Sequence, residues 1–366
     1  MNMEVFKMDM FKKVMSGILA LSLCVGVGSV NVNAASTYKK GDIDGNGSIT
    51  LSDAAYMNQF LHGSKSANAR TVERLDVNGD YIINDYDRSL LSNMIINGSV
   101  TTLSYNNTSA LPIQSSRTYY VYSPSTGVRN DVYTLNPVNN ITTSGTSTMS
   151  IIDGDDRYIE NGLDGVINVQ YSSGSNCGTA FVIGPHTLLT AAHVVYNSTN
   201  LRFKIFTNYN TESDVQITPT AYHIPSMYVS GSDSWKYDYA IVKVSEDLSD
   251  YVNFDLGVMR NEVPLSRTVY ATGFGGNCEG ITSGLADVKS TGTGSFVSMS
   301  DNDAKNYVFH YNVDTVPGDS GSPVYVRNTD GSQTVIGIHT YGGNGYNQAI
   351  RITSDILHFA YNNSNL

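Results

Sequence analysis

The sequence predicts a mostly β-stranded protein that begins with a small α-helical segment, and three observations lead to this fold class. From Ile151 onward, short runs of alternating apolar and polar residues are separated by Gly, Pro, Asn and Ser, as in antiparallel sheets. The 366 residues include 25 Tyr and 33 Gly, which suit pleated surfaces and tight turns. Two acidic stretches near the N-terminus each lead into a helical pattern of apolar residues.

The expected strands follow one another over the last two hundred or so residues of the chain. The runs are GVINVQY, TAFVI, LRFKIF, YAIVKV, TVYATGF, YVFHYNV, SPVYV and VIGIHTYG. Only the stretch SDILHFAYN has helical spacing, so we expect a single helix at the C-terminal end of this region.

Composition limits the classes of partner. The formal net charge is −11 and the isoelectric point is near 5.0, so no basic surface is available to neutralise phosphates and we expect no nucleic acid partner. The length suffices for one large domain or two modest ones.

Residues 1–34 read as a secretory signal peptide. Lys12 and Lys13 precede an apolar run over residues 14–30, and small residues stand before a cut after Ala34. The run is shorter than the ~20 residues that a membrane-spanning helix needs. We therefore expect an exported, extracellular protein with no membrane segment after removal of the signal. Cys177 and Cys278 then remain, either as a disulfide or as two buried thiols.

Two twelve-residue windows, DIDGNGSITLSD and DVNGDYIINDYD, start 34 residues apart and carry oxygen-bearing side chains at positions one, three, five and twelve. Such a loop can wrap six or seven oxygens around one calcium ion. A single acidic loop is usually a solvated turn, whereas two in tandem, each opening a helix, favour two calcium sites. The expected ligands are Asp42, Asp44, Asn46, the Ser48 carbonyl and Asp53 in the first loop, and Asp76, Asn78, Asp80, the Ile82 carbonyl and Asp87 in the second.

The paired loops resemble a dockerin, a module that anchors enzymes to cohesin domains on multienzyme scaffolds such as cellulosomes, over about residues 41–98. The resemblance implies calcium and a cohesin partner, and a role alongside polysaccharide-degrading enzymes. The sixth loop residue, which needs positive φ, is Gly47 in one repeat and Tyr81 in the other, so we expect a weaker second site. The residues that contact cohesin in dockerins also differ between the repeats: they are Leu51–Ser52 and Asp85–Tyr86.

Residues 99–149 are rich in Ser, Thr, Asn and Pro and are expected to be a linker or pro-segment. The run RTYYVYS, residues 117–123, is the one stretch there with the composition of a strand.

Three residues in the β-rich region have the properties of a nucleophilic catalytic set. Ser320 lies in the cramped turn TVPGDSGSPVYV, His193 directly follows an apolar strand in TLLTAAHVV, and Asp238 opens the strand KYDYAIVKV. Hydrolysis of a peptide needs a nucleophile, a base, a group that orients the base, and donors for the oxyanion. The order His, Asp, Ser along the chain is that of chymotrypsin-type proteases.

Together with SIIDGDDR and VIGIHTYGG, these motifs resemble the trypsin-like fold in its bacterial glutamyl endopeptidase branch, over residues 150–366. The resemblance implies two six-stranded antiparallel β-barrels and a secreted serine endopeptidase that needs no catalytic cofactor. It implies that Ser320 is the nucleophile, that His193 is the general base and then acid, and that Asp238 orients the histidine. The backbone N–H groups of Gly318 and Ser320 would form the oxyanion hole.

The resemblance also gives two readings of specificity. Asp314, six residues before Ser320, stands where trypsin reads Lys or Arg, whereas Thr315 and His339 match the residues with which glutamyl endopeptidases read an acidic side chain. We favour cleavage after Glu, and the alternatives are a Lys/Arg preference or an inert pseudo-protease that only binds peptides. A departure is that many relatives have a cysteine directly after the histidine, where this chain has Val194.

A last expectation concerns activation. Ile151 lies 42 residues before His193, close to the spacing in trypsin-like enzymes whose new N-terminus inserts into the protein. Asp319 is the residue type that pairs with such an ammonium group, so we expect a cut near Ser150. Such a cut would separate the protease from its dockerin, making docking and activity mutually exclusive.

Overall fold

The structure is a computed structural model that describes residues 37–98, 102–104, 117–135, 155–174, 176–208, 211–275, 288–298, 307–343 and 345–364. The expected signal peptide, the proposed cut near Ser150 and Cys278 lie outside these residues. In the part described, no helix combines the length and the apolar character needed to cross a bilayer.

The N-terminal region is helical, as expected, with one more helix than the sequence pattern indicated. Its elements are β1 (Thr37–Lys39), α2 (Leu51–Leu61), α3 (Ala69–Leu75), β2 (Ile82–Ile83), α4 (Asp85–Asn97) and β3 (Thr102–Ser104), and β1 pairs with β3. α2 and α4 each begin with a capping box, Thr50 with Asp53 and Asn84 with Asp87, in which side chains satisfy the free N–H groups of the first turn. The twelfth residue of each loop therefore also starts the helix that follows.

The first sheet of the C-terminal region has nine strands in the order β11-β10-β7-β8-β9-β13-β12-β4-β5. Its strands are β4 (Arg117–Tyr122), β5 (Arg129–Leu135), β7 (Val166–Gln170), β8 (Asn176–Gly184), β9 (Thr187–Thr190), β10 (Arg202–Asn208), β11 (Thr211–Ile217), β12 (Pro219–Pro225) and β13 (Ala240–Val244). Short helices join them: α5 (Ala192–Val195), α6 (Ser226–Ser230), η1 (Ser234–Tyr237) and η2 (Ser249–Tyr251).

The second sheet is a closed barrel, because β20 pairs with both β19 and β21 at the two ends of a six-strand series. The series runs β20-β19-β16-β17-β18-β21, with β14 added beside β20 and β6 beside β17. The strands are β6 (Tyr158–Ile159), β14 (Asp255–Leu256), β16 (Thr268–Gly273), β17 (Ser290–Ser298), β18 (Val308–Tyr311), β19 (Pro323–Arg327), β20 (Gln333–Gly343) and β21 (Tyr346–Arg351). Between β14 and β16 the chain forms β15 (Val258–Met259), which pairs with β2 in a separate two-stranded sheet.

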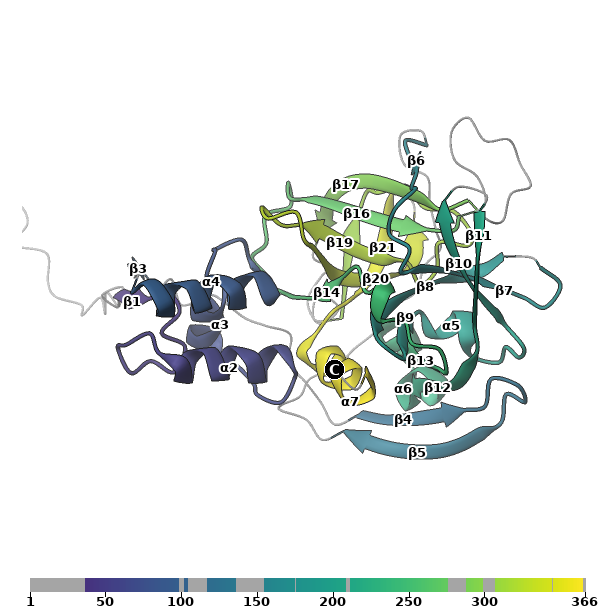
Figure 1. Ribbon diagram of the computed structural model, residues 1–366, viewed down its shortest axis with the longest axis horizontal. Coiled ribbons are helices and arrows are strands. Elements are labelled where there is room, and N and C mark those ends of the chain that lie inside the picture. The colour runs from purple at the N-terminus through teal and green to yellow at the C-terminus, as the bar shows by residue number, and fades with distance from the viewer. Residues whose placement is uncertain are drawn as a thin grey trace, which may run out of the picture. The chain divides into compact units, whose positions relative to one another are not determined.

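The predicted fold class is confirmed: antiparallel β-sheet dominates and a C-terminal helix, α7 (Ser354–Ser364), follows the last strand. Strands β4 and β5, which lie within the expected linker, form a hairpin that extends the first sheet beyond β12 (Figure 1). The hairpin is anchored by a buried ion pair, 2.8 Å between Arg117 Nη2 and Asp355 Oδ2, and by Tyr119 stacked on Phe359 at 4.0 Å. The stretch from Arg117 to Leu135 is therefore part of the β fold.

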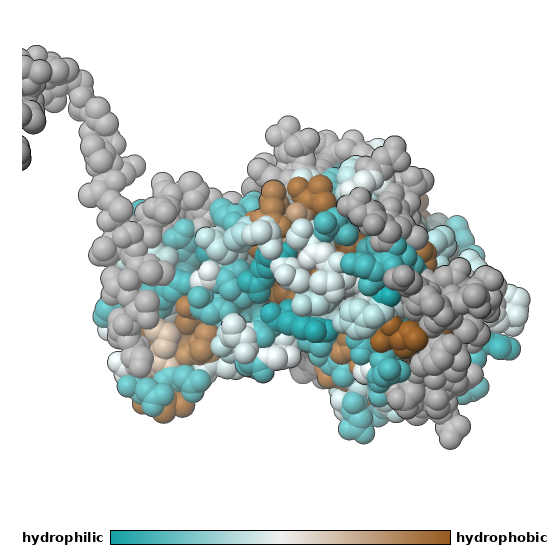
Figure 2. Space-filling view, turned by 90° about the horizontal axis from the view of Figure 1, so that it is seen from above, coloured by the Kyte–Doolittle hydropathy of each residue, from teal (hydrophilic) through white to brown (hydrophobic). Residues whose placement is uncertain are grey.

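The interior is filled by the apolar positions of the strands. All five residues of β7 are buried, as are four of the five in β13, because these strands are covered on both faces. On the face shown in Figure 2, apolar residues gather in separate patches among hydrophilic ones. The two sheets supply the walls between which the candidate site lies.

Candidate active site

His193 is held beside Asp238 by two hydrogen bonds. It lies in α5, the single turn of helix after β9, with Ala191 and Ala192 buried on its N-terminal side. The backbone N–H of His193 donates to Asp238 Oδ1 at 2.9 Å, and Nδ1 lies 2.7 Å from Oδ2. This arrangement fixes the ring and leaves Nε2 free to face a substrate; the side chain is 28% exposed.

Asp238 is fully buried between η1 and β13. Burial most of all, and then the Asp238 charge, raises the pKa of the nearby Tyr341 hydroxyl, and the Tyr341 ring stacks on His193 with 5.5 Å between centroids. Sequence reasoning missed Tyr341. A bulge in β20 between His339 and Tyr341 changes the two-residue alternation there, so the pattern of the strand does not predict where Tyr341 points.

The charge of Asp238 controls the protonation of His193. Burial lowers the pKa of the imidazole, but the negative charge of Asp238 and the hydrogen bond to it raise the pKa by more, so the net shift is upward. A buried carboxylate therefore stabilises the imidazolium that forms when the ring takes up a proton.

Ser320 lies against the segment that carries His193. Its carbonyl accepts from the Thr179 N–H at 2.7 Å, and a Cβ at the next residue, Gly321, would come within 3.1 Å of the Ala191 nitrogen. A Cβ at Gly178 would contact both Val194 and the Ser320 carbonyl. The chain on the two sides of His193 thus lies close to Gly321 of the serine loop and to Gly178 of β8, and neither position has room for a side chain.

The turn before Ser320 has the geometry for two free amides. Gly318 has φ 110°, a conformation that side chains disfavour, and its carbonyl is held by the Thr179 hydroxyl at 2.9 Å. Within the described residues, neither the Gly318 nor the Ser320 N–H donates a hydrogen bond. The two donors that the sequence assigned to an oxyanion hole are therefore available for one.

Asp319, the expected partner of a new N-terminus, already has a cationic partner. Its Oδ2 lies 3.4 Å from Arg157 Nη1 and accepts the Val316 N–H at 2.8 Å. Burial raises the pKa of Asp319 and Arg157 acts against that rise. Arg157 stands in the motif SIIDGDDR, but its pairing with Asp319 was not anticipated from the sequence.

The three candidate specificity residues are all buried, and they differ in their contacts. Asp314 Oδ2 accepts the N–H of Asp156 at 3.1 Å, so this carboxylate supports the chain near Arg157. Thr315 Oγ1 and His339 Nε2, in contrast, are buried and make no hydrogen bond in the part of the chain described. Buried polar atoms normally have partners, so these two are candidates to receive one from a ligand.

His339 is held by Tyr311, whose hydroxyl lies 2.6 Å from Nδ1. Burial lowers the pKa of His339 to about 3, and the charge of protonated His193 acts in the same direction. The ring is therefore neutral at ordinary pH and carries one N–H. Burial also raises the pKa of Tyr311, which keeps its hydroxyl protonated.

Cys177 has no disulfide partner among the residues that the structure describes, and its Sγ lies 3.5 Å from the carbonyl of Val194, which stands where many relatives have a cysteine. Burial raises the pKa of this thiol, which disfavours the reactive thiolate. Its expected partner Cys278 lies outside the described residues, so the pairing remains a prediction.

The first acidic loop gathers its carboxylates. Ligand oxygens of Asp42, Asp44 and Asp53 all lie within 4.8 Å of one another, and Asn46 Oδ1 accepts the N–H of Ser48 at 2.8 Å on the exposed rim. Gly47 has φ 91° as predicted. An all-oxygen set of this kind fits calcium.

In the second loop, the carboxylates accept hydrogen bonds from backbone amides and form ion pairs with Arg260 and Arg267 from the C-terminal region. Asp76 accepts from the Gly79 and Tyr81 amides, Asn78 Oδ1 accepts the Asp80 N–H, and Asp80 Oδ1 accepts the Ile82 N–H. Asp87 Oδ1 accepts the Asn78 N–H, matching Asp53 in the first loop. Tyr81 has φ 72°, which confirms that this non-glycine residue adopts the strained conformation. The donor set of the second loop also fits calcium, and the backbone strain at Tyr81 acts against calcium binding there.

A β-barrel fold with a histidine–aspartate pair beside a glycine-flanked serine turn is the architecture of trypsin-like proteins. The chain belongs to the trypsin family, whose model matches residues 151–362, and a model of the dockerin type I domain matches residues 40–96.

Two curated relatives come from Bacillus. An extracellular metalloprotease of Bacillus subtilis is 30% identical over 49% of this chain and 55% of its own length. A glutamyl endopeptidase of Bacillus licheniformis is 28% identical over 58% of this chain and 68% of its own length. A solved structure of a Glu endopeptidase in complex with MPD shares 21% identity with a TM-score of 0.47, covering 59% of this chain and 100% of that one.

The raised pKa of His193 predicts the acidic limit of activity. Only the neutral ring can accept a proton from serine, so kcat/KM should fall as pH drops through the His193 pKa, with the midpoint above the usual value of about 6.5. The measurement is a pH profile on an uncharged peptide ester. Asp238→Asn should lower both the midpoint and kcat, the latter by roughly 10⁴-fold.

Asp233→Asn is the matched control, since Asp233 pairs with Lys236 in the neighbouring turn and not with His193. An acidic midpoint at or below about 6.5 in the wild type would contradict the assigned role of the Asp238 charge.

Proposed function

We propose that this protein is a secreted serine endopeptidase that a dockerin attaches to a cohesin-bearing scaffold. The observation that carries the enzymatic part is the buried Asp238–His193 pair beside a serine turn with two free amides. The trypsin family match and the name of the glutamyl endopeptidase relative support the same reaction class.

In the proposed reaction, Ser320 Oγ attacks the scissile carbonyl while His193 Nε2 takes its proton. The carbonyl oxygen gains a negative charge, which the Gly318 and Ser320 amides stabilise. The imidazolium then gives its proton to the leaving amine, and water repeats the sequence to release the acyl group. Asp238 and Tyr341 keep the ring in one orientation throughout, since both contact the ring or its carboxylate partner.

We propose a preference for Glu before the cleaved bond. Thr315 Oγ1 and His339 Nε2 are buried donors without partners, and an acidic side chain would supply the acceptors. If the Tyr311 hydroxyl donates to Nδ1, the single ring proton of His339 is on Nε2 and can be donated to a carboxylate. Asp314, the residue for the Lys/Arg alternative, is bound to the Asp156 amide.

Maturation by a cut near Ser150 is part of the proposal. The buried pair of Asp319 and Arg157 supplies a charge partner close to the serine without an inserted ammonium group, so the proposed cut is not needed to neutralise Asp319. N-terminal sequencing of the active species identifies the first residue of the mature enzyme.

The dockerin part of the proposal gives one calcium ion to each loop. The first loop would bind its ion through Asp42, Asp44, Asn46, Ser48 and Asp53, and the second through Asp76, Asn78, Asp80, Ile82 and Asp87. Calcium neutralises the converging carboxylates of each loop and so orders the helix that follows. The ordered helices would present the surface that a cohesin module binds.

The first prediction is that a fluorophosphonate labels the native protein at Ser320. Ser320→Ala should abolish labelling and reduce hydrolysis of casein by a factor on the order of 10⁶, since the members of a triad act as a unit. Ser332→Ala is the control, because Ser332 is an exposed loop serine bonded to Asp330. Labelling and turnover that persist in Ser320→Ala would refute the assignment, and a labelled protein without turnover would favour the pseudo-protease.

The second prediction concerns specificity in a peptide library. Cuts should follow Glu, and His339→Ala should lower kcat/KM for Glu peptides roughly 10- to 100-fold while affecting Gln peptides less, because a charge-assisted hydrogen bond is lost. His310→Gln is the control, since His310 bonds Ser298 on another strand. A preference for Lys or Arg would assign the pocket to Asp314.

The third prediction is calcium-dependent capture by an immobilised panel of cohesin modules. Capture should be lost in excess chelator, and Asp44→Ala should raise the calcium concentration needed for it at least several-fold, because one of three converging carboxylates is removed. Asp131→Ala on the β4–β5 hairpin should have no effect. Capture that survives chelation would contradict the role of the two loops.

A further inference from the structure

The second dockerin repeat is joined to the protease domain by a shared sheet. β2 (Ile82–Ile83) pairs antiparallel with β15 (Val258–Met259), and all four side chains are 0% exposed. The Arg260 N–H continues the ladder by donating to the Tyr81 carbonyl at 2.8 Å. A strand pair buried on both sides adds a hydrophobic contact to the backbone hydrogen bonds.

Charges of opposite sign meet across this junction. Arg260 Nη1 lies 2.5 Å from Asp76 Oδ2, with Glu73 Oε1 3.6 Å from Nη2, and only 9% of the arginine side chain is exposed. Arg267 Nη2 lies 3.0 Å from Asp80 Oδ2. Removing one partner of a buried pair leaves the other charge uncompensated, so these contacts oppose separation of the second repeat from the protease domain.

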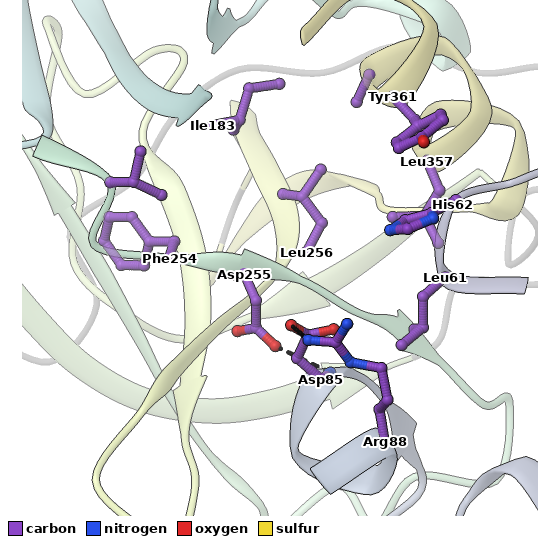
Figure 3. A pocket seen from close by; sticks show the side chains of 12 residues that line it. Leu61, His62, Asp85, Arg88, Ile183, Phe254, Asp255, Leu256, Leu357 and Tyr361 are labelled. Carbon is purple, nitrogen blue, oxygen red and sulfur yellow. Dashed lines mark hydrogen bonds and ion pairs between the residues drawn. The ribbon is translucent and has the colours of Figure 1, made fainter. Parts of the chain in front are cut away.

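The start of α4 continues the junction. Asn84 Nδ2 donates to Thr334 Oγ1 at 2.9 Å, and the Asp85 N–H donates to Asp255 Oδ2 at 3.2 Å (Figure 3). Asp85 belongs to the pair that corresponds to Leu51–Ser52 in the first repeat. The other member, Tyr86, accepts a hydrogen bond from Thr329 Oγ1 at 2.8 Å.

The end of α2 also reaches the protease domain, at α7. The His62 and Tyr361 rings stack at 4.3 Å, and a Cβ at Gly63 would lie 2.4 Å from the backbone of His358. Between α2, α4 and α7 the junction encloses a cavity of about 300 Å³, lined partly by apolar residues such as Leu61, Phe254 and Leu357 (Figure 3).

The first repeat is open where the second is covered. Leu51 is 76% exposed and Ser52 is also exposed. The structure thus gives the two repeats different environments, although their sequences align position by position.

We propose that the dockerin is bound to its own protease domain through the second repeat, remains bound after a cut near Ser150, and offers only the first repeat to a scaffold. The partner and the cut rest on the proposed function, whereas the internal docking rests on the contacts above. Docking to a scaffold and proteolysis can then occur in the same particle. This replaces the expectation that cleavage separates the two activities.

The contacts are compatible with calcium in the second loop. A carboxylate has about four lone-pair sites, and Asp76 accepts from the Gly79 and Tyr81 amides and from Arg260, so about one site is left for an ion. The test is therefore made in calcium-containing buffer on the full chain.

The experiment uses the Ser320→Ala chain with a C-terminal affinity tag and an inserted recognition sequence for a site-specific endoprotease. Insertion within residues 105–116 separates the dockerin from the β4–β5 hairpin, and insertion within residues 136–149 separates both from the protease domain. After cutting, the protein is captured by its tag, washed at physiological ionic strength, and the retained N-terminal fragment is quantified. We expect near-stoichiometric retention for both positions of the cut.

Arg260→Gln should reduce retention of the dockerin at least tenfold after the cut within residues 105–116. Arg327→Gln is the matched control, because the Arg327 side chain, at the end of β19, contacts Tyr158 and Tyr270 of the protease domain. Loss of the dockerin from the otherwise unaltered Ser320→Ala chain, or equal retention in the two arginine variants, overturns the proposal.

Hydrogen exchange on the uncut chain gives a second readout if Arg260→Gln is poorly soluble after cutting. The amides of Ile83 and Val258, which lie opposite each other two residues along from the Arg260–Tyr81 hydrogen bond, should be protected in wild type and exchange at least tenfold faster in Arg260→Gln, with the barrel strands unchanged; unprotected amides in wild type overturn the docking. Neither assay requires catalysis or a cohesin, so both test the internal docking even if the proposed function is wrong.

Discussion

The buried carboxylate of Asp238 is the group on which the candidate site depends. It has no exposure, yet it accepts hydrogen bonds from the backbone and the ring of His193. Tyr341, which comes from the second sheet, stacks on the same imidazole, so the ring is held between groups of both sheets. Because an unpaired buried charge is strongly destabilising, the pairing of Asp238 with His193 holds the imidazole in one orientation.

In the helical region, too, single residues have two structural roles. Asp53 and Asp87 each close a calcium loop and cap the helix that follows, so the loop and the helix cannot be altered independently. The second loop has a further constraint, since its Asp76 and Asp80 face Arg260 and Arg267 of the trypsin-like region. The two copies of the repeat therefore lie in different surroundings, which is the basis of the proposed internal docking.

The proposed specificity residues differ in how their buried polar atoms are paired. In the part of the chain that the structure describes, Thr315 and His339 have atoms without hydrogen-bond partners, whereas Asp314, which sequence comparison with trypsin would favour, is engaged by a backbone amide. In the interior an unpaired donor costs more than it does at a surface, which supports the proposal that a substrate group binds these two atoms.

The sequence by itself determined the local features of this protein: the calcium loops with their helices, the alternating strands, and the residue types at 193, 238 and 320. These follow from periodicity and from short motifs, which depend on nearby residues. The sequence also correctly placed positive φ at Gly47 and Tyr81. Only the tertiary structure decided the roles of Tyr341, Arg157 and Arg260. Each acts on a residue far along the chain, and a bulge in one strand or a turn between two domains decides where such a side chain points.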